Sequence, residues 1–147
     1  MIFEERKMNL FDLENQDYLF VHCISMDLAL GAGIAKTFRD RYDMKKKLLE
    51  FRKSHPQYFT EFSYGFCVTI NNVANLITKK NYYNKPTLKT MEESLISLKK
   101  HCEAYNVKKI AMPKIGCGLD RLDWEDVSSI IKKIFSDLDV EIIVCSI

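Results

Sequence analysis

The chain has 147 residues, of which 47% are hydrophobic and 29% charged, and its formal net charge at pH 7 is +2. That length and composition predict one domain over residues 1–147 with a sizeable core. So small an excess of positive charge gives no argument by itself for nucleic-acid binding.

Cysteine usage and apolar run lengths give an expectation about the compartment. The five cysteines are scattered along the chain without a CxxC pair. The apolar runs are too short for a transmembrane helix, and the first residues lack the apolar segment of a signal peptide. We therefore expect a reduced, cytoplasmic protein with no membrane partner.

Apolar runs alternate along the chain with amphipathic segments. In chain order these patterns predict a strand at Ile2–Glu5, a strand at Tyr18–Ile24, helices at Ile34–Tyr42 and Lys45–Lys53, strands at Gly65–Ile70 and Ala74–Thr78, a helix after Pro86, a strand at Lys109–Met112, a helix from Trp124 with Asp123 as its N-cap, and a strand at Val140–Cys145. Strands that alternate with helices predict an α/β fold, here a three-layer α/β/α sandwich. The short connection at Asn71-Asn72 makes one strand pair antiparallel, so we expect a mixed six-stranded sheet.

Two glycine-containing turns each follow a predicted strand and precede a helix. They are Gly31-Ala32-Gly33 and Gly116-Cys117-Gly118. Glycine has no Cβ, so backbone N–H groups in such a turn can close on an anion. Either turn alone is also compatible with a simple strand-to-helix connection, and the first lacks the further glycine of a GxGxxG motif. Together the two turns could hold the two halves of a diphosphate.

Lys79 lies at the end of the strand Ala74–Thr78 and could face the same ligand. On pattern alone a solvated strand end explains it better, because lysine pairs recur elsewhere in the chain. As a nucleophile, its amine would have to lose a proton to a nearby carboxylate. Asp120, just after the second glycine turn, is the candidate acceptor.

Other residues with chemical potential are better explained without a function. Cys117 has no histidine near it in sequence, and His22 is placed as a hydrogen-bonded histidine of the core. His55 and His101 show no metal-ligand spacing, so no metal site is predicted. The run Lys45-Lys46-Lys47 is typical of a solvated helix face, with DNA binding through it as the alternative.

Several segments, in one order over nearly the whole chain, carry a family resemblance. They are His22-Cys23-Ile24-Ser25, Gly31-Ala32-Gly33-Ile34-Ala35, Leu76-Ile77-Thr78-Lys79-Lys80, Lys85-Pro86-Thr87, Met112-Pro113-Lys114-Ile115-Gly116-Cys117-Gly118-Leu119-Asp120-Arg121-Leu122 and Trp124-Glu125. In them the chain resembles macrodomains. More narrowly, it is similar to the terminal ADP-ribose protein glycohydrolase type, to which antitoxin macrodomains that remove ADP-ribose from DNA are related.

The resemblance implies a binding site for ADP-ribose with the diphosphate between the two glycine turns. The implied binding residues are Asn9, Leu10, Ser25, Gly31, Ala32, Gly33, Ile34, Pro113, Ile115, Gly116, Cys117, Gly118 and Leu119. It further implies that Lys79 attacks the anomeric carbon of the distal ribose and forms a covalent lysyl–ADP-ribose intermediate, whose breakdown Asp120 assists. Ser25 would line the distal-ribose side. ADP-ribose is then ligand and product, and no cofactor or metal is implied.

Two positions depart from the family pattern. Asn9 stands where the family usually has an aspartate that contacts the adenine amine, and Val144–Ile147 lacks the aromatic residue often found at the end of the last strand. Asn9 can still accept a hydrogen bond through its carbonyl oxygen.

The expected function is an ADP-ribosyl hydrolase, acting as a monomer. Its substrates would be glutamate or aspartate esters on protein, ADP-ribosylated bases in single-stranded DNA, or O-acetyl-ADP-ribose. The alternative is a non-catalytic module that only binds ADP-ribose. The presence of both Lys79 and Asp120 favours the enzyme.

Overall fold

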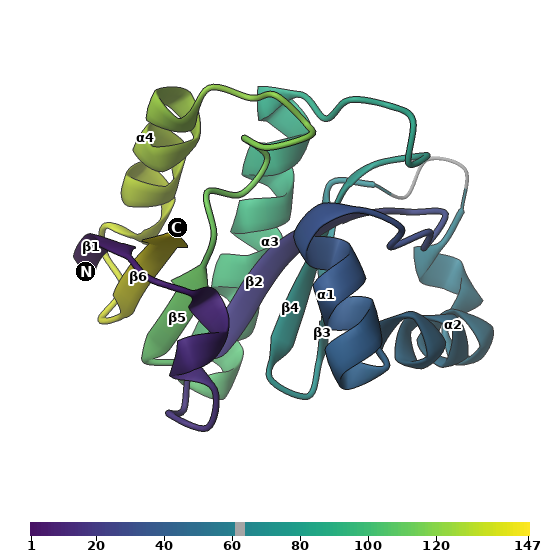
Figure 1. Cartoon of the computed structure of the whole chain (residues 1–147), viewed down its shortest axis with the longest axis horizontal. Helices are drawn as coiled ribbons and strands as arrows, with labels where there is room; N and C mark the ends of the chain where they lie inside the picture. Colours follow the sequence, from purple (N-terminus) through teal and green to yellow (C-terminus); the bar gives the residue numbers. More distant parts are fainter. Residues whose placement is uncertain (61–63) are drawn as a thin grey trace.

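Six strands form one sheet in the computed structural model, which describes residues 1–60 and 64–147 (Figure 1). They are β1 (Ile2–Lys7), β2 (Leu19–Ser25), β3 (Phe66–Ile70), β4 (Val73–Lys79), β5 (Lys109–Met112) and β6 (Glu141–Ser146). Their order across the sheet is β1-β6-β5-β2-β4-β3. Every predicted strand is present, with ends that differ from the prediction by two residues at most.

The sheet is parallel except at one edge. β3 pairs antiparallel with β4, and their hairpin closes with Ile70 opposite Val73. Asn71 lies in this two-residue turn with φ of 55°, a left-handed conformation that asparagine tolerates better than most residues. The remaining neighbours, from β1 to β4 across the sheet, are parallel. The predicted mixed sheet is confirmed.

Helices cover both faces of the sheet. They are α1 (Gly33–Tyr42), α2 (Met44–Ser54), α3 (Leu88–Tyr105) and α4 (Trp124–Phe135), with single 3-10 turns η1 (Leu10–Leu13) and η2 (Pro56–Tyr58). The predicted cap of α4 is present, because the Asp123 side chain accepts a hydrogen bond from the Glu125 N–H at 2.9 Å. At the start of α3, Thr87 and Thr90 bond each other's backbone N–H groups in a capping box.

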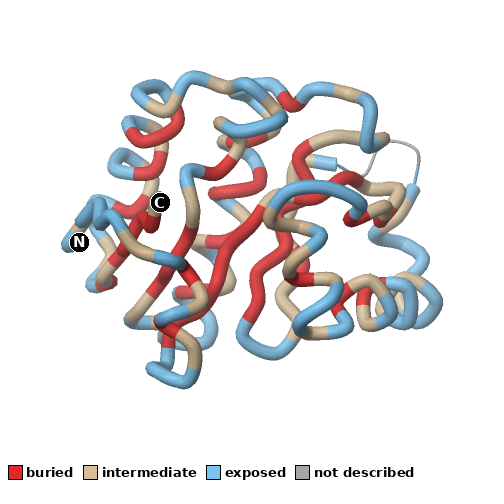
Figure 2. Tube along the Cα trace, in the orientation of Figure 1, coloured by how far each residue is buried: buried red, intermediate tan, exposed pale blue. Residues whose placement is uncertain are grey.

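Two apolar cores lie on either side of the sheet. One packs α3 and α4 against side chains such as Val21, Leu76 and Ile110, and the other packs η1, α1 and α2 against Phe20 and Ile77. Figure 2 shows the central strands as the most continuously buried part of the chain. The three-layer α/β/α sandwich is therefore confirmed.

A buried polar pair lies within the second core. His22 of β2 is fully buried, stacks on Phe38 at 4.2 Å between ring centroids, and its Nε2 lies 2.5 Å from Asn75 Oδ1. Asn75 Nδ2 in turn donates to the Val68 carbonyl at 3.0 Å, so Asn75 Oδ1 is an acceptor and His22 Nε2 carries the proton. His22 is the core histidine that the sequence predicted.

The topology creates a crevice at the carboxyl ends of the parallel strands. β2 and β5 are neighbours, and because they are parallel their carboxyl ends meet at the same edge. From there the chain leaves β2 towards α1 on one face and leaves β5 towards α4 on the other. Ligands of open α/β sheets bind at such a divergence. At this edge the pairing of β2 with β4 has an irregularity between Ile24 and Ser25 that brings Ser25 opposite Lys79.

Candidate active site

A cavity of about 700 Å³ opens at this divergence, a volume typical of small-molecule sites. It gathers most of the residues that the sequence singled out: Ser25, Gly31, Ala32, Gly33, Ile34, Lys79, Pro113, Ile115, Gly116, Gly118, Leu119 and Asp120. These positions come from the ends of three strands and the loops that follow them. Because those strands are adjacent and parallel, segments far apart in sequence meet here.

Both glycine turns line the cavity, and a Cβ added to Gly33 of the first would lie 3.5 Å from Leu119 Cδ1 beside the second. The glycines of the two turns have different roles. Gly116 has a φ of +73°, a left-handed conformation that favours glycine, and a Cβ added there would also lie 2.6 Å from Met91 Cε. A Cβ at Gly31 or Gly118 would meet nothing within 4 Å. These two positions therefore keep space open beside the backbone, where a ligand can approach it.

The amino terminus of α1 also faces the cavity. Gly33, Ile34 and Ala35, its first residues, line the wall. The N-cap residue is Ala32, and within the described part of the chain no side chain caps this helix. The first N–H groups of a helix lack partners inside the helix and carry a partial positive charge. This wall is therefore suited to an anionic group such as a phosphate.

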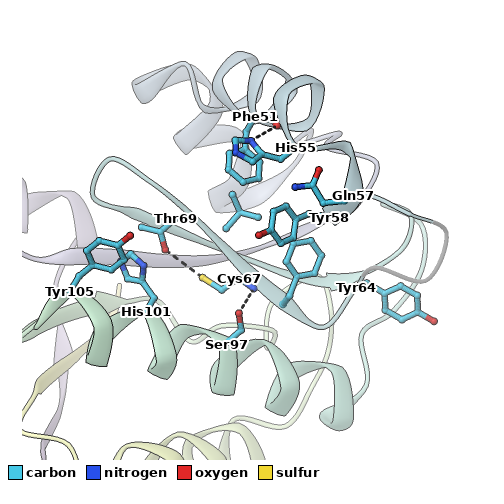
Figure 3. Close-up of a pocket in the computed structure, with 12 residues that line it drawn as sticks. Phe51, His55, Gln57, Tyr58, Tyr64, Cys67, Thr69, Ser97, His101 and Tyr105 are labelled. Carbon is cyan, nitrogen blue, oxygen red and sulfur yellow. Dashed lines mark hydrogen bonds between the residues drawn. The ribbon is translucent and has the colours of Figure 1, made fainter.

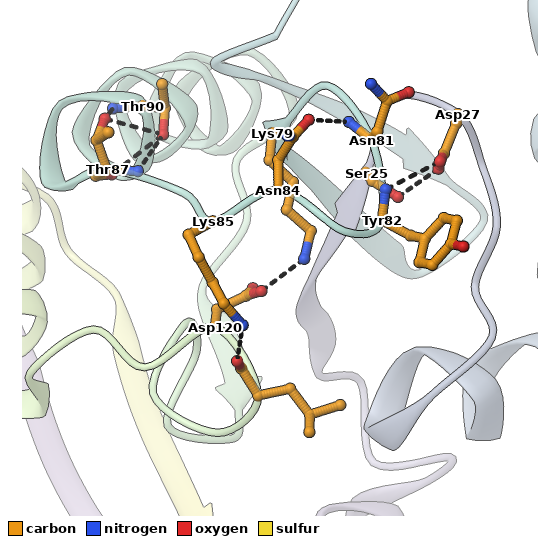
Figure 4. A network of polar contacts seen from close by, with 11 residues as sticks. Ser25, Asp27, Lys79, Asn81, Tyr82, Asn84, Lys85, Thr87, Thr90 and Asp120 are labelled. Carbon is orange, nitrogen blue, oxygen red and sulfur yellow. Dashed lines mark hydrogen bonds and ion pairs between the residues drawn. The ribbon is translucent and has the colours of Figure 1, made fainter.

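Lys79 and Asp120 meet inside the cavity. Lys79 Nζ lies 2.6 Å from Asp120 Oδ1, and their side chains are only 13% and 15% exposed (Figure 4). The loop holds Asp120 in place because the Leu122 N–H donates to the Gly116 carbonyl at 2.8 Å. A carboxylate beside a lysine amine can accept its proton, which is one way in which an amine nucleophile is activated.

Three further residues complete the site, and the sequence did not single them out as functional. Asp27 joins two loops, since its carboxylate accepts from Ser25 Oγ and, at 2.9 Å, from the Tyr82 N–H. Lys85 Nζ donates to the Leu119 carbonyl at 2.6 Å across the loops, close to Asp120 (Figure 4). Tyr82 and Lys85 line the cavity. The available indication was Lys85-Pro86-Thr87, which carried the family resemblance without an assigned role.

The cysteines near the cavity are not nucleophiles at neutral pH. Burial raises the pKa of the Cys117 thiol to about 11, with the charge of Asp123 adding to the effect. Burial likewise raises the pKa of Cys23, with Asp120 as the next cause. Cys117 Sγ donates to the Ile115 carbonyl at 3.3 Å. Both thiols are therefore protonated, and Cys117 is not among the residues that line the cavity.

Asn9 and Leu10 lie outside the cavity lining as well. Asn9 Oδ1 accepts a hydrogen bond from the Phe11 N–H at 2.9 Å and so caps η1, whereas Leu10 is buried in the core under α1.

Among the described residues no group of three or more histidine, cysteine or acidic side chains could hold a metal ion. None of the helices within residues 1–60 and 64–147 is long and apolar enough to cross a membrane.

Known proteins share this sequence and this architecture. Residues 21–131 match the family model described as Macro domain. Over 138 residues the chain is 40% identical to ADP-ribose glycohydrolase OARD1 of Bos taurus, covering 94% of this chain and 87% of that protein. It is 27% identical over 131 residues to a DNA ADP-ribosyl glycohydrolase of Mycobacterium tuberculosis, covering 84% of this chain and 36% of that protein. Among solved structures, the macrodomain of Mycobacterium tuberculosis DarG superposes with a TM-score of 0.84 at 22% identity, over 99% of this chain and 98% of that one.

Proposed function

Because this chain belongs to the macrodomain family, we propose that it is an ADP-ribosyl hydrolase that removes ADP-ribose from modified acceptors. The observation that carries the proposal is the contact between Lys79 and Asp120, 2.6 Å apart inside the cavity between the two glycine turns. The activities named for the relatives OARD1 and DNA ADP-ribosyl glycohydrolase support the same conclusion.

In this proposal the diphosphate lies between the glycine turns. The open space beside Gly31 and Gly118 and the uncapped start of α1 support that placement. The distal ribose then lies towards Ser25 and Lys79, which are opposite each other at the strand ends. The adenine extends towards Asn9, beyond the cavity lining.

The proposed reaction has two steps. Asp120 accepts a proton from the Lys79 ammonium, since ordinary lysine is almost fully protonated at neutral pH and only the neutral amine is nucleophilic. The amine attacks the anomeric carbon of the distal ribose, a carbon–nitrogen bond forms, and the acceptor leaves with the electrons of its bond. Once Asp120 has released its proton to solvent, it accepts a proton from water. That water attacks the same carbon, and the Lys79 amine and free ADP-ribose are released.

The acceptor determines how difficult the first step is. A glutamate or aspartate carboxylate and an acetate are stable anions and leave without protonation. A nucleobase is a poorer leaving group and needs a proton at the departing nitrogen. The same lysine can therefore act on both classes, with the ester expected to react faster unless the base is specifically recognised.

Release of ADP-ribose from two substrates tests the proposal. One is a protein modified on glutamate and the other is single-stranded DNA carrying an ADP-ribosylated base. Wild type, Lys79→Ala and Asp120→Asn are compared, with Lys80→Ala as the matched control next in sequence. We expect wild type and Lys80→Ala to release ADP-ribose at similar rates, and Lys79→Ala and Asp120→Asn to release it at least about a hundredfold more slowly. Calorimetry should show that both inactive variants bind ADP-ribose within a few fold of the wild-type affinity.

Two results would contradict this scheme. Release of ADP-ribose by Lys79→Ala at the wild-type rate would show that the lysine has no covalent role. Tight ADP-ribose binding by wild type without release from either substrate would make the chain a binding module. In that case Lys79 would serve as a cation of the pocket.

A further inference from the structure

A carboxylate beside the proposed active site fixes the orientation of one hydroxyl that lines it (Figure 4). Ser25 lines the cavity and is only 4% exposed. Its Oγ donates to Asp27 Oδ1 at 2.5 Å, a distance usual for a hydroxyl that donates to a carboxylate. Asp27 is not among the described residues that line the cavity. It is therefore placed to act on a ligand through Ser25 and not by contact.

This hydrogen bond determines which role the Ser25 hydroxyl has towards a ligand. A hydroxyl has one proton to donate and two lone pairs that accept. Within the described part of the chain, Asp27 is the one hydrogen-bond partner of Ser25 Oγ, and the bond uses that proton. The oxygen therefore faces the cavity as an acceptor.

The Asp27 carboxylate is itself held in place by its own loop and by a neighbouring one. Oδ1 also accepts from the Ala29 N–H at 3.2 Å, and Oδ2 accepts from the Tyr82 N–H at 2.9 Å. All three contacts donate to Asp27, the pattern of a carboxylate. Leu28 and Leu30, both buried, have φ of 58° and 44°. Such left-handed leucines persist only where the surroundings fix them, so the loop around Asp27 is rigidly determined.

The same loop is fixed against the strand end that carries Lys79. The Met26 N–H donates to the Lys79 carbonyl at 2.9 Å, and the Asp27 N–H donates to the Lys80 carbonyl at 3.1 Å. These bonds continue the pairing of β2 with β4 beyond the irregularity that brings Ser25 opposite Lys79. The backbone therefore fixes the positions of the hydroxyl and the amine relative to each other.

We propose that Asp27 is a positioning residue, which orients the Ser25 oxygen to accept a hydrogen bond from a hydroxyl of the distal ribose. The place of the ribose rests on the proposed function. As the acceptor leaves, positive charge develops on the ribose ring, and a hydrogen bond from the hydroxyl next to the anomeric carbon strengthens. The charge of Asp27 polarises Ser25 and makes its oxygen a better acceptor. No proton passes between the two side chains, which act by orientation and charge alone.

A double-mutant cycle tests whether Asp27 acts through Ser25. Release of ADP-ribose from a protein modified on glutamate is measured for wild type, Ser25→Ala, Asp27→Asn and the double variant. Asparagine has one acceptor oxygen for the donors on both sides and carries no charge. Each single substitution should lower kcat at least about tenfold, because a charge-assisted hydrogen bond is lost or weakened.

The double variant decides between positioning and a merely structural role. Because both substitutions remove the same interaction, its kcat should match that of Ser25→Ala within about twofold. KM should change less than kcat, because the interaction is strongest in the transition state. If the two effects multiply instead, Asp27 acts independently of Ser25 and the proposal is overturned.

Asn84→Ala is the matched control for loosening of the loop that carries Tyr82. Asn84 Oδ1 accepts from the Asn81 N–H at 2.9 Å within that loop and does not contact Ser25. Whatever its effect on kcat, that effect should multiply with the effect of Ser25→Ala. A control that is coupled to Ser25 as strongly as Asp27→Asn would also overturn the proposal.

Binding of ADP-ribose gives a readout that does not require turnover. A second cavity, of about 660 Å³, lies over the edge strand β3 and is lined mainly by aromatic rings (Figure 3). No lysine or arginine is among the described residues that line it, so it offers no such cation to a diphosphate. The cavity of the proposed active site is lined by Lys79 and Lys85. We therefore expect calorimetry to report on the cavity that contains Ser25.

Calorimetry with ADP-ribose and with ADP, which lacks the distal ribose, separates this inference from the proposed function. Ser25→Ala and Asp27→Asn should each weaken ADP-ribose binding by a few fold, without further loss in the double variant, and leave ADP binding unchanged. If wild type releases no ADP-ribose, the proposed function is refuted, and this binding pattern alone decides the role of Asp27. Equal losses for ADP and ADP-ribose, or wild-type values of kcat and affinity in Asp27→Asn, would overturn the inference. Failure of wild type to bind ADP-ribose would overturn both.

Discussion

Acidification should destabilise the fold through His22. Burial lowers the pKa of His22 from 6.5 to about 4, and the hydrogen bond with Asn75 only partly opposes that shift. Between these two values the unfolded chain binds a proton that the folded chain does not. Stability is therefore fully present above about pH 6.5 and is lost as the pH falls towards 4.

The size of the effect follows from the two pKa values. Their difference of about 2.5 corresponds to a total of about 3 kcal/mol, because each pH unit in that window is worth about 1.4 kcal/mol. Between pH 7.5 and pH 5.0 the expected loss in the free energy of unfolding is about 2 kcal/mol. That is a substantial part of the stability of a typical domain.

Urea denaturation at the two pH values, for wild type and His22→Gln, measures this loss. Glutamine does not titrate, so the variant should lose about 2 kcal/mol less than wild type over the interval, whatever its stability at pH 7.5. Burial also lowers the pKa of His101, but that contribution is common to both proteins and cancels. Equal losses in wild type and variant would refute the conclusion that His22 is buried and neutral.

Two further changes test local features of the structure by chemical denaturation. Gly116→Ala should lower the free energy of unfolding by about 1–3 kcal/mol, because alanine is strained at a φ of +73° and its Cβ would also lie close to Met91 Cε. Gly118→Ala is the matched control, because Gly118 has no such φ and its Cβ would meet nothing within 4 Å. Equal losses in the two variants would show that the left-handed backbone at Gly116 is not the cause. Thr87→Ala removes the side-chain cap of α3 and should cost about 1 kcal/mol, whereas an unchanged midpoint would show that the cap contributes little.

The fold was largely predictable because the four central strands, β2, β4, β5 and β6, are buried on both faces. Such strands appear in the sequence as continuous apolar runs, so their existence was clear even where their ends were not. The two edge strands, β1 and β3, are less buried. The polar continuation of β1 to Lys7 is set by pairing with β6 rather than by hydrophobicity. Asn71-Asn72 identified the antiparallel pair because a two-residue connection cannot join parallel strands.

The site was predictable where it depends on strand ends and less so where loops touch each other. Lys79 follows a strand and Asp120 follows a glycine turn, and the structure brings them within 2.6 Å of each other at the carboxyl ends of the strands. The catalytic roles proposed for them come from the family resemblance. The contact of Lys85 with the Leu119 carbonyl depends on how two irregular loops approach in space, which no local pattern encodes.

In the proposed mechanism, the irregularity at the end of β2 positions the reacting residues separately from the loops that would contact the acceptor. It sets Ser25 level with Lys79 at the end of two central strands, where the pairing of β2 with β4 fixes their relative position. Tyr82 and Leu119, by contrast, lie on loops beyond the strand ends, with their side chains 66% and 64% exposed. If the proposed mechanism holds, substitutions in these loops can change which acceptor binds while the Lys79 amine stays in place, so the substrate range can diversify by mutation without a change in the catalytic residues.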